Sequence, residues 1–257
     1  MLALERAVAA GADALELDVH ASRDGHLVVC HDATVDRTTA GHGAIASMTL
    51  AELRALDNGY WWVPGEVVDH DRDDAEYPLR GRAPADATLA IATLDEVLDA
   101  FPGIFLNLDI KQTAPEVEPY EERLAKALMA HRRSDDVIVA SFNDAATAAF
   151  RSFAPQIGTS AGIMGVADFW RACHQGEVPA RLDHVALQVP VATAGVTVLD
   201  QILVEAAHDQ GLAVHAWTID DAAEMARLVD LGVDGIISDV PSVLATVLAA
   251  AGATYQP

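Results

Sequence analysis

The residues best suited to chemistry are two acids near the start of the chain, Glu16 and Asp18, and a histidine thirteen residues after Asp18, His31. Residues 14–19 alternate apolar and charged side chains, which is typical of a strand with one packed face. On such a strand Glu16 and Asp18 point to the same side. Neighbouring carboxylates on a partly buried face need a cation to hold them. The pair therefore predicts a cation site, and a strand whose acidic face meets water is the alternative interpretation.

The chain between Asp18 and His31 is too short for a parallel crossover, so we expect a β-hairpin. Asp24-Gly25 is a tight-turn signal, and an apolar strand follows it. With these two residues as the whole turn, Val29 pairs with His20, and His31 pairs with Asp18. The hairpin is thus predicted to bring an imidazole beside the two carboxylates, which suits metal binding combined with acid–base chemistry.

Composition limits the classes of protein to which the chain can belong. Its 257 residues, 51% of them hydrophobic, are enough for one α/β-barrel domain over residues 1–257. The 16 basic and 39 acidic residues give a formal charge of −23, which disfavours nucleic acid and anionic membranes as partners. Two cysteines provide no disulfide framework, and the given residues show neither a charged-then-apolar pattern of a signal peptide nor an apolar run of membrane-spanning length. We expect a cytoplasmic protein that acts on a small molecule without stable membrane insertion.

Strand and helix patterns alternate along most of the chain, which indicates a parallel sheet. Capping boxes at Thr49/Glu52 and Thr93/Glu96 predict the starts of two helices, and an irregular segment is inserted at about 57–92. The sequence has no glycine-rich phosphate loop, which disfavours a dinucleotide-binding fold. Seven segments have the pattern of parallel strands, beginning near residues 14, 104, 137, 157, 184, 212 and 235.

A closed (β/α)8 barrel has eight strands, with its chemistry at their C-terminal ends. The chain has seven and opens directly in a helix. We therefore expect an α/β fold, a (β/α)8 TIM barrel whose first strand is missing from this chain, with the hairpin and the insertion following the first strand present. A seven-stranded doubly wound sheet is the alternative. The unfilled edge would expose backbone groups beside the strands near 14 and 235, so we expect disorder, pairing with a neighbour or low stability there.

The strand near 104 carries Asn107, Asp109 and Lys111 on one face. An internal salt bridge is the simplest interpretation of Asp109 and Lys111. After Glu16 and Asp18 in a barrel pattern, we prefer a third carboxylate ligand and a cation for a phosphate. Three carboxylates with water suit Mg²⁺ or Ca²⁺, whereas zinc would recruit histidine or cysteine ligands.

Taken together, the motifs have a family resemblance. Glu-Leu-Asp-Val, Arg-Asp-Gly, Leu-Val-Val-x-His-Asp, Asp-Arg-Thr-Thr, Asn-x-Asp-Ile-Lys, Ala-Trp-Thr and Gly-Ile-Ile-Ser-Asp occur in this order. The ordered set resembles the glycerophosphodiester phosphodiesterase family over nearly the whole chain. The resemblance implies a (β/α)8 barrel enzyme, a phosphoric diester hydrolase that uses one divalent metal ion. Such an enzyme cleaves glycerophosphodiesters to glycerol 3-phosphate and an alcohol.

Position by position, the resemblance implies metal ligands at Glu16, Asp18 and Asp109, an acid–base role for His31 and a phosphate contact for Lys111. Asp109 stands where the family usually has a glutamate. The Asn-x-Asp-Ile-Lys form is similar to a lysophospholipase-D-like branch, so hydrolysis of lysophospholipids is an alternative activity. The tryptophan pair at 61–62 in the insertion would suit an acyl chain, or would pack as a cap on the barrel rim.

Later strands supply further candidates. Trp217 resembles the family's aromatic wall over the glycerol site, with ordinary barrel filling as the alternative. His215 lies deeper on the same face, and we expect it to be a hydrogen-bonded residue of the barrel lumen. His20 either reaches the site or decorates a solvated hairpin. Gln188 and Asp239 either contact substrate hydroxyls or satisfy backbone groups.

The sequence departs from the family at its start. The family opens with a strand ending His-Arg-Gly and a Pro-Glu-Asn-Thr segment, whereas residues 1–7 already match the helix that follows. The second acid–base histidine, its arginine and a glutamate therefore have no counterpart here, as after a start codon assigned too late. His31 can fill only one of two proton-transfer roles, so we expect low turnover. A truncated or non-catalytic phosphodiester-binding barrel is a further alternative.

Overall fold

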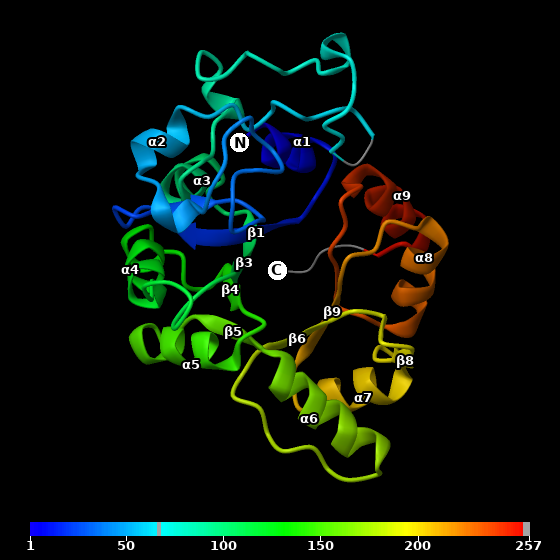
Figure 1. Cartoon of the computed structure of the whole chain (residues 1–257). Coiled ribbons are helices and arrows are strands. Elements are labelled where there is room, and N and C mark those ends of the chain that lie inside the picture. The colour runs from blue at the N-terminus through cyan, green and yellow to red at the C-terminus, as the bar shows by residue number, and fades with distance from the viewer. Residues whose placement is uncertain (66–67, 254–257) are drawn as a thin grey trace. The chain divides into compact units, whose positions relative to one another are not determined.

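The structure is a computed structural model that describes residues 1–65 and 68–253 (Figure 1). The chain divides into two compact units. Unit 1 comprises Met1–Glu5, Leu17–Gly103 and Asp109–Arg133. Unit 2 comprises Arg6–Glu16, Ile104–Leu108 and Ser134–Pro257. Helix α1 (Leu2–Ala9) and strands β1 (Ala14–Ala21) and β3 (Phe105–Ile110) each contribute residues to both units.

The strands of unit 1 follow the order β3-β1-β2, and β2 (Leu27–Val29) pairs antiparallel with β1. The predicted hairpin is confirmed, but its predicted register is wrong by one residue. His20 lies opposite Val28 rather than Val29. The backbone N–H of Cys30 donates to the carbonyl of Asp18 at 3.0 Å, so Cys30 rather than His31 lies opposite Asp18.

The register differs because the turn has three residues instead of two. The Ser22 N–H donates to the His26 carbonyl at 2.9 Å and so closes the hairpin around residues 23–25. Gly25 has φ +85°, the left-handed conformation that glycine adopts without steric cost and that three-residue hairpin loops require. A shift of one residue exchanges the two faces of a strand, so the position of His31 depends on the chain beyond β2.

Both predicted capping boxes are confirmed in unit 1. The Thr49 and Thr93 side chains accept from the N–H groups of Glu52 and Glu96, whose carboxylates accept in return from the threonine N–H groups. They open α2 (Leu50–Arg54) and α3 (Leu94–Ala100). A small apolar core lies beneath, and it comprises Val28, Val35, Ile45, Leu53 and Ile91. The remaining regular elements of this unit are α4 (Glu121–Ala130) and the 3-10 helices η1 (Ile45–Ser47), η2 (Asp74–Glu76) and η3 (Ala87–Leu89).

Unit 2 contains a parallel sheet. Five strands run parallel in the order β4-β5-β6-β9-β10, and β3 is the neighbour of β4. All seven segments that were predicted to be parallel-type strands contain a strand. The five strands are β4 (Val137–Ala140), β5 (Gly158–Ala161), β6 (Ala186–Val189), β9 (Ala213–Ala216) and β10 (Gly235–Ile236).

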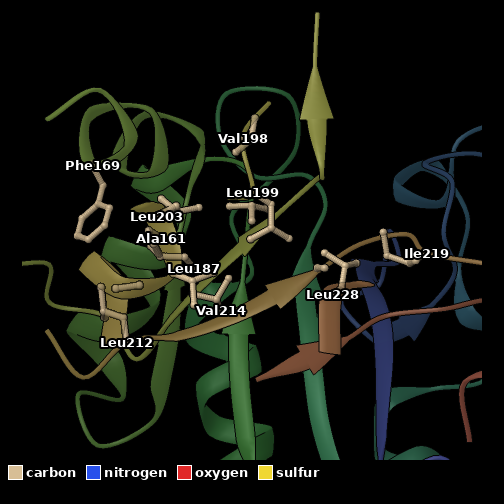
Figure 2. Packing of buried hydrophobic residues seen from close by; sticks show 14 of the residues in the cluster. Ala161, Phe169, Leu187, Val198, Leu199, Leu203, Leu212, Val214, Ile219 and Leu228 are labelled. Carbon is tan, nitrogen blue, oxygen red and sulfur yellow. The ribbon is translucent and has the colours of Figure 1, made fainter. Parts of the chain in front are cut away.

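Helices follow these strands and cover the outer face of the sheet in unit 2 (Figure 1). The core between them is apolar, and Leu187 of β6 pairs with Val214 of β9 near its centre (Figure 2). Both side chains are fully buried, and each such burial stabilises the fold by about 1.5–3 kcal/mol. The helices are α5 (Asp144–Phe153), α6 (Ile163–His174), α7 (Gln201–Asp209), α8 (Ala222–Leu231) and α9 (Pro241–Ala251).

One element of unit 2 was not predicted. Strands β7 (Ala192–Thr193) and β8 (Val196–Thr197) form a small hairpin after β6. Its turn residues Ala194 and Gly195 both have positive φ, as a two-residue hairpin turn requires. Each strand has only two exposed residues, too few to show an alternating pattern.

The edge of the sheet in unit 2 is β10, whose sheet neighbour among the described strands is β9. The absence of a first barrel strand and the single-domain organisation both stay predictions. In residues 1–65 and 68–253 no helix combines the length and the apolar character needed to cross a membrane.

Candidate active site

Two acids and one lysine form the centre of the candidate site in unit 1. The Lys111 Nζ lies 2.8 Å from Asp18 Oδ1 and 3.0 Å from Asp109 Oδ2. Asp18 and Asp109 are each only 8% exposed. The salt bridge that the simplest interpretation of Asp109 and Lys111 predicted is therefore present, and it includes Asp18. The two carboxylates converge on one cationic nitrogen.

Burial and charge act against each other at this centre. Burial raises the pKa of Asp18 above its usual range, although the Lys111 ammonium and the His31 imidazole both favour the charged carboxylate. Burial disfavours the Lys111 ammonium, but Asp18 and Asp109 outweigh this effect and raise the pKa of Lys111. Lys111 is therefore positively charged at neutral pH and partly neutralises the acids.

The donor set suits a hard cation, because carboxylates supply only oxygen ligands and Asp18 and Asp109 already share one positive group. Glu16 is exposed on β1 and belongs to unit 2. Among the described residues, no three His, Cys, Asp or Glu side chains form a group that could hold a metal ion. The structure thus brings together two of the three predicted ligands, at Lys111.

His31 lies on the exposed loop that follows β2. Its Nδ1 is 2.7 Å from Asp32 Oδ1, and its side chain is 68% exposed. Arg37 donates to the same carboxylate from Nε at 2.6 Å and from Nη2 at 3.1 Å. These bonds from Arg37, with the bond from His31, lower the pKa of Asp32 to about 2 in spite of partial burial. Because an ionised carboxylate only accepts hydrogen bonds, Nδ1 carries the proton and Nε2 is left to exchange one.

His20 is 3% exposed, so the solvated-hairpin interpretation of this residue is wrong. Its Nε2 lies 3.5 Å from the backbone carbonyl of His31. Burial lowers the pKa of His20, although this carbonyl and Asp18 oppose the effect. His20 is therefore a neutral side chain beneath the His31 backbone at neutral pH.

The insertion contacts the same loop. Trp61 is half-buried, donates from Nε1 to the Thr39 carbonyl at 2.7 Å and stacks on His70 with ring centroids 4.5 Å apart. These contacts favour the packing interpretation of Trp61 over contact with an acyl chain.

In unit 2, Trp217 follows β9 and is half-buried. Its ring lies 5.4 Å from that of Phe142, which is 53% exposed. Asp239 is exposed, and its backbone N–H donates to Asp220 at 2.9 Å. The backbone rather than the carboxylate of Asp239 makes this contact.

His215 is hydrogen-bonded, as predicted. Gln188 lies beside it in the β6–β9 register and donates from Nε2 to His215 Nδ1 at 3.3 Å. Gln188 also forms two amide–amide bonds with Asn107, at 2.8 and 3.2 Å. Burial lowers the pKa of His215, so its ring is neutral at neutral pH. Sequence reasoning missed this network because Asn107 and Gln188 are 81 residues apart.

Comparisons with known proteins agree on one family. The model of the glycerophosphoryl diester phosphodiesterase family matches residues 1–243. A glycerophosphodiester phosphodiesterase of Caldanaerobacter subterraneus subsp. tengcongensis is 32% identical over 249 residues, which cover 94% of this chain and 88% of the relative.

Solved structures share the fold. The glycerophosphoryl diester phosphodiesterase domain of a Mycobacterium tuberculosis protein matches with a TM-score of 0.77 at 22% identity, over 97% of this chain and 92% of that one. An Oleispira antarctica phosphodiesterase, solved with its product sn-glycerol-3-phosphate, matches with a TM-score of 0.70 at 25% identity, over 96% and 90%. These likenesses confirm the predicted α/β-barrel fold class.

Proposed function

Because this chain belongs to the glycerophosphoryl diester phosphodiesterase family, we propose that it hydrolyses glycerophosphodiesters to glycerol 3-phosphate and an alcohol with the help of one divalent cation, Mg²⁺ or Ca²⁺. The observation that carries the proposal is the convergence of Asp18 and Asp109 on the Lys111 ammonium. The glycerol 3-phosphate product of the Oleispira antarctica phosphodiesterase supports the substrate class.

Asp18 and Asp109 would hold the cation, and Glu16 is the third ligand that the family resemblance implies. A bound divalent ion supplies Lewis-acid stabilisation of charge on a phosphate oxygen. Lys111 is the cation of this chain that lies between the two acids, and its ammonium would pair with a phosphate oxygen. Buried acids next to a fixed positive charge form a site in which a phosphodiester is oriented by charge.

His31 would move the proton. Its Nε2 is the nitrogen free to take a proton from an attacking hydroxyl or to give one to the leaving alkoxide. Asp32, ionised and held by Arg37, would stabilise the imidazolium that forms. Loss of one general acid or base typically costs ~100- to 10,000-fold in rate. With His31 as the one acid–base histidine matched in this chain, low turnover or a non-catalytic binding role is the alternative.

A second substrate class has an observation in its favour. Unit 2 exposes large apolar side chains after the C-terminal ends of β4 and β5, namely Phe142 at 53%, Ile163 at 58% and Met164 at 64%. Phe142 packs near Trp217, the proposed aromatic wall for glycerol. Exposed apolar side chains at this end of a barrel suit a substrate with an acyl chain. Lysophospholipids are therefore the second candidate.

We also propose that the protein is cytoplasmic and that its substrate is a small molecule rather than nucleic acid. Both cysteines, Cys30 and Cys173, are free. The charge of −23 opposes binding to a polyanion. Fractionation of cells that produce the protein would test the location.

The test of function is hydrolysis by the purified chain of glycerophosphocholine and lysophosphatidylcholine in parallel, with Mg²⁺, Ca²⁺ or EDTA. We expect glycerol 3-phosphate from the first substrate and loss of activity in EDTA. Changing an outer-shell group of a metal site typically lowers activity by about 10- to 100-fold. D109N changes a proposed direct ligand, so it should lower the rate by more than about 100-fold. D168N, which changes an exposed acid on α6, is the matched control. Equal rates for D109N and D168N would refute the proposal.

A further inference from the structure

The insertion in unit 1 encloses a cation of the chain itself. The guanidinium carbon of Arg80 lies 4.3 Å from the ring centroid of Tyr60, 4.5 Å from that of Trp61 and 3.7 Å from that of Tyr77. The Arg80 side chain is only 14% exposed. The quadrupole of an aromatic ring attracts a cation over its face, and this attraction is stronger when the cation is desolvated. Tyr60, Trp61 and Tyr77 thus form an aromatic cage around Arg80.

Arg80 also fixes the segment through polar contacts. Its Nε donates to the Tyr60 carbonyl at 3.2 Å, and its Nη1 pairs with Asp74 at 2.5 Å. Its Nη2 is buried, and within the described residues no hydrogen-bond acceptor reaches it. The ring faces therefore contribute much of what holds this charge in place.

The cage rests on three consecutive residues of the loop that follows β2. Trp61 donates to the carbonyl of Thr39 at 2.7 Å. His70, stacked on Trp61, donates from Nε2 to the carbonyl of Arg37 at 3.1 Å. Thr38 donates to the Asn58 side chain at 2.6 Å. The insertion thereby holds the backbone at residues 37–39.

Residues 37–39 include Arg37, whose side chain helps to orient His31, the proposed proton-transfer group. Arg37 holds the Asp32 carboxylate at two points, and Asp32 accepts from His31 Nδ1. The His31 side chain is 68% exposed, and its Nδ1 lies 2.7 Å from Asp32 Oδ1. Its orientation therefore depends on Asp32, and through Arg37 on the insertion.

We propose that Arg80 is a positioning residue for His31. In its aromatic cage it braces residues 37–39, so that Arg37 and Asp32 hold the His31 imidazole in its working orientation. This inference rests on the proposed function, because it assumes that His31 transfers a proton.

The first test compares R80A with R82A in hydrolysis of glycerophosphocholine. Arg82 lies in the same insertion, is 56% exposed and pairs only loosely with Asp86 at 3.3 Å, so R82A is the matched control. We expect R80A to lower kcat by about 10- to 100-fold, since a misplacement of about 1 Å caused by a distant mutation can cost that much. The KM should change less than about twofold, because Arg80 acts on proton transfer and not on phosphate binding. Equal kcat values for R80A and R82A would overturn the inference.

A double-mutant cycle tests the route. If Arg80 acts through Arg37, the variant R37A/R80A should have the same kcat as R37A alone. If the kcat losses of R37A and R80A multiply in the double variant, Arg80 acts by another route, and the inference is rejected. Guanidinium ion should refill the emptied cage of R80A and restore kcat, whereas urea, which is neutral and of similar shape, should not.

Two further variants cover the case in which R80A does not fold. W61F removes the indole N–H that reaches Thr39 but keeps a ring in the cage, and H70F removes the bond to Arg37 but keeps the stack. Each should lower kcat with little change in KM, and wild-type kcat in both would refute the inference. H31A separates the two levels. An active H31A defeats the proton-transfer role that the proposed function gives to His31, whereas an inactive H31A beside a fully active R80A defeats only the positioning role of Arg80.

Discussion

Lys111 shows how one residue can determine the state of a site. Its ammonium lies within 3.0 Å of both Asp18 and Asp109, which are mostly buried. Two negative charges that contact one nitrogen repel each other strongly in a medium of low dielectric constant. Any change at Lys111 must therefore be compensated by protonation or by another cation.

The first prediction concerns the removal of this charge. K111M leaves Asp18 and Asp109 facing each other, and we expect a loss of about 1–3 kcal/mol in the free energy of unfolding, below the 3–5 kcal/mol typical of a fully buried pair. Added Mg²⁺ or Ca²⁺ should raise the melting temperature of K111M more than that of the wild type. K126M is the control, because Lys126 is the only other lysine and its pair with Glu122 is exposed. A K111M variant as stable as K126M would contradict this account.

The second prediction concerns the pH dependence of the Asp32–Arg37 pair. The pKa of Asp32 is lowered from 3.8 to about 2, so the pair stabilises the folded state above the unfolded pKa and loses this effect as pH falls towards 2. After allowance for solvent screening, about 1 kcal/mol separates wild type from R37A at neutral pH. In urea unfolding this difference should be constant above pH 5 and should shrink towards pH 2. A difference that grows in acid would have the wrong sign.

At the scale of elements, local rules predicted helix starts well. The capping boxes at Thr49 and Thr93 were predicted from sequence spacing alone, and both form, because each depends on residues three apart in the chain. The hairpin register failed, although its turn was recognised. Asp24-Gly25 fits a two-residue and a three-residue loop equally well, and the bond from Ser22 to His26 decides between them.

The third prediction concerns the start of α3. T93A removes a cap that is 8% exposed and accepts from Glu96, and we expect it to cost about 1 kcal/mol in the free energy of unfolding. T93S keeps the hydroxyl and should retain most of the stability. Chemical denaturation of the three proteins measures both effects. If T93S is as unstable as T93A, the methyl group rather than the cap is responsible.

At the scale of the whole molecule, charge acts on the entire chain. A formal charge of −23 produces repulsion that opposes the compact state. Positive groups cannot offset it, because 16 basic residues stand against 39 acidic ones.

The fourth prediction follows from this imbalance. Raising NaCl from about 10 mM to about 150 mM, where the screening length falls to roughly 8 Å, should raise the melting temperature. Sodium sulfate at the same ionic strength is the control, since any additional rise measures ion exclusion rather than screening. A melting temperature that is independent of NaCl would show that self-repulsion contributes little.

The sequence by itself determined the seven strand segments, the two capping boxes and the residues that are suited to catalysis or metal binding, because these depend on periodicity and short spacing. The contact between Asp109 and Lys111 follows from their spacing on one strand, but tertiary structure decided the contacts between strands. Lys111 reaches Asp18 because β1 and β3 are neighbours in the sheet, and Gln188 joins Asn107 and His215 across strands far apart in sequence. The chain distances between these partners are too long for spacing rules, and only the pairing of strands brings their side chains together.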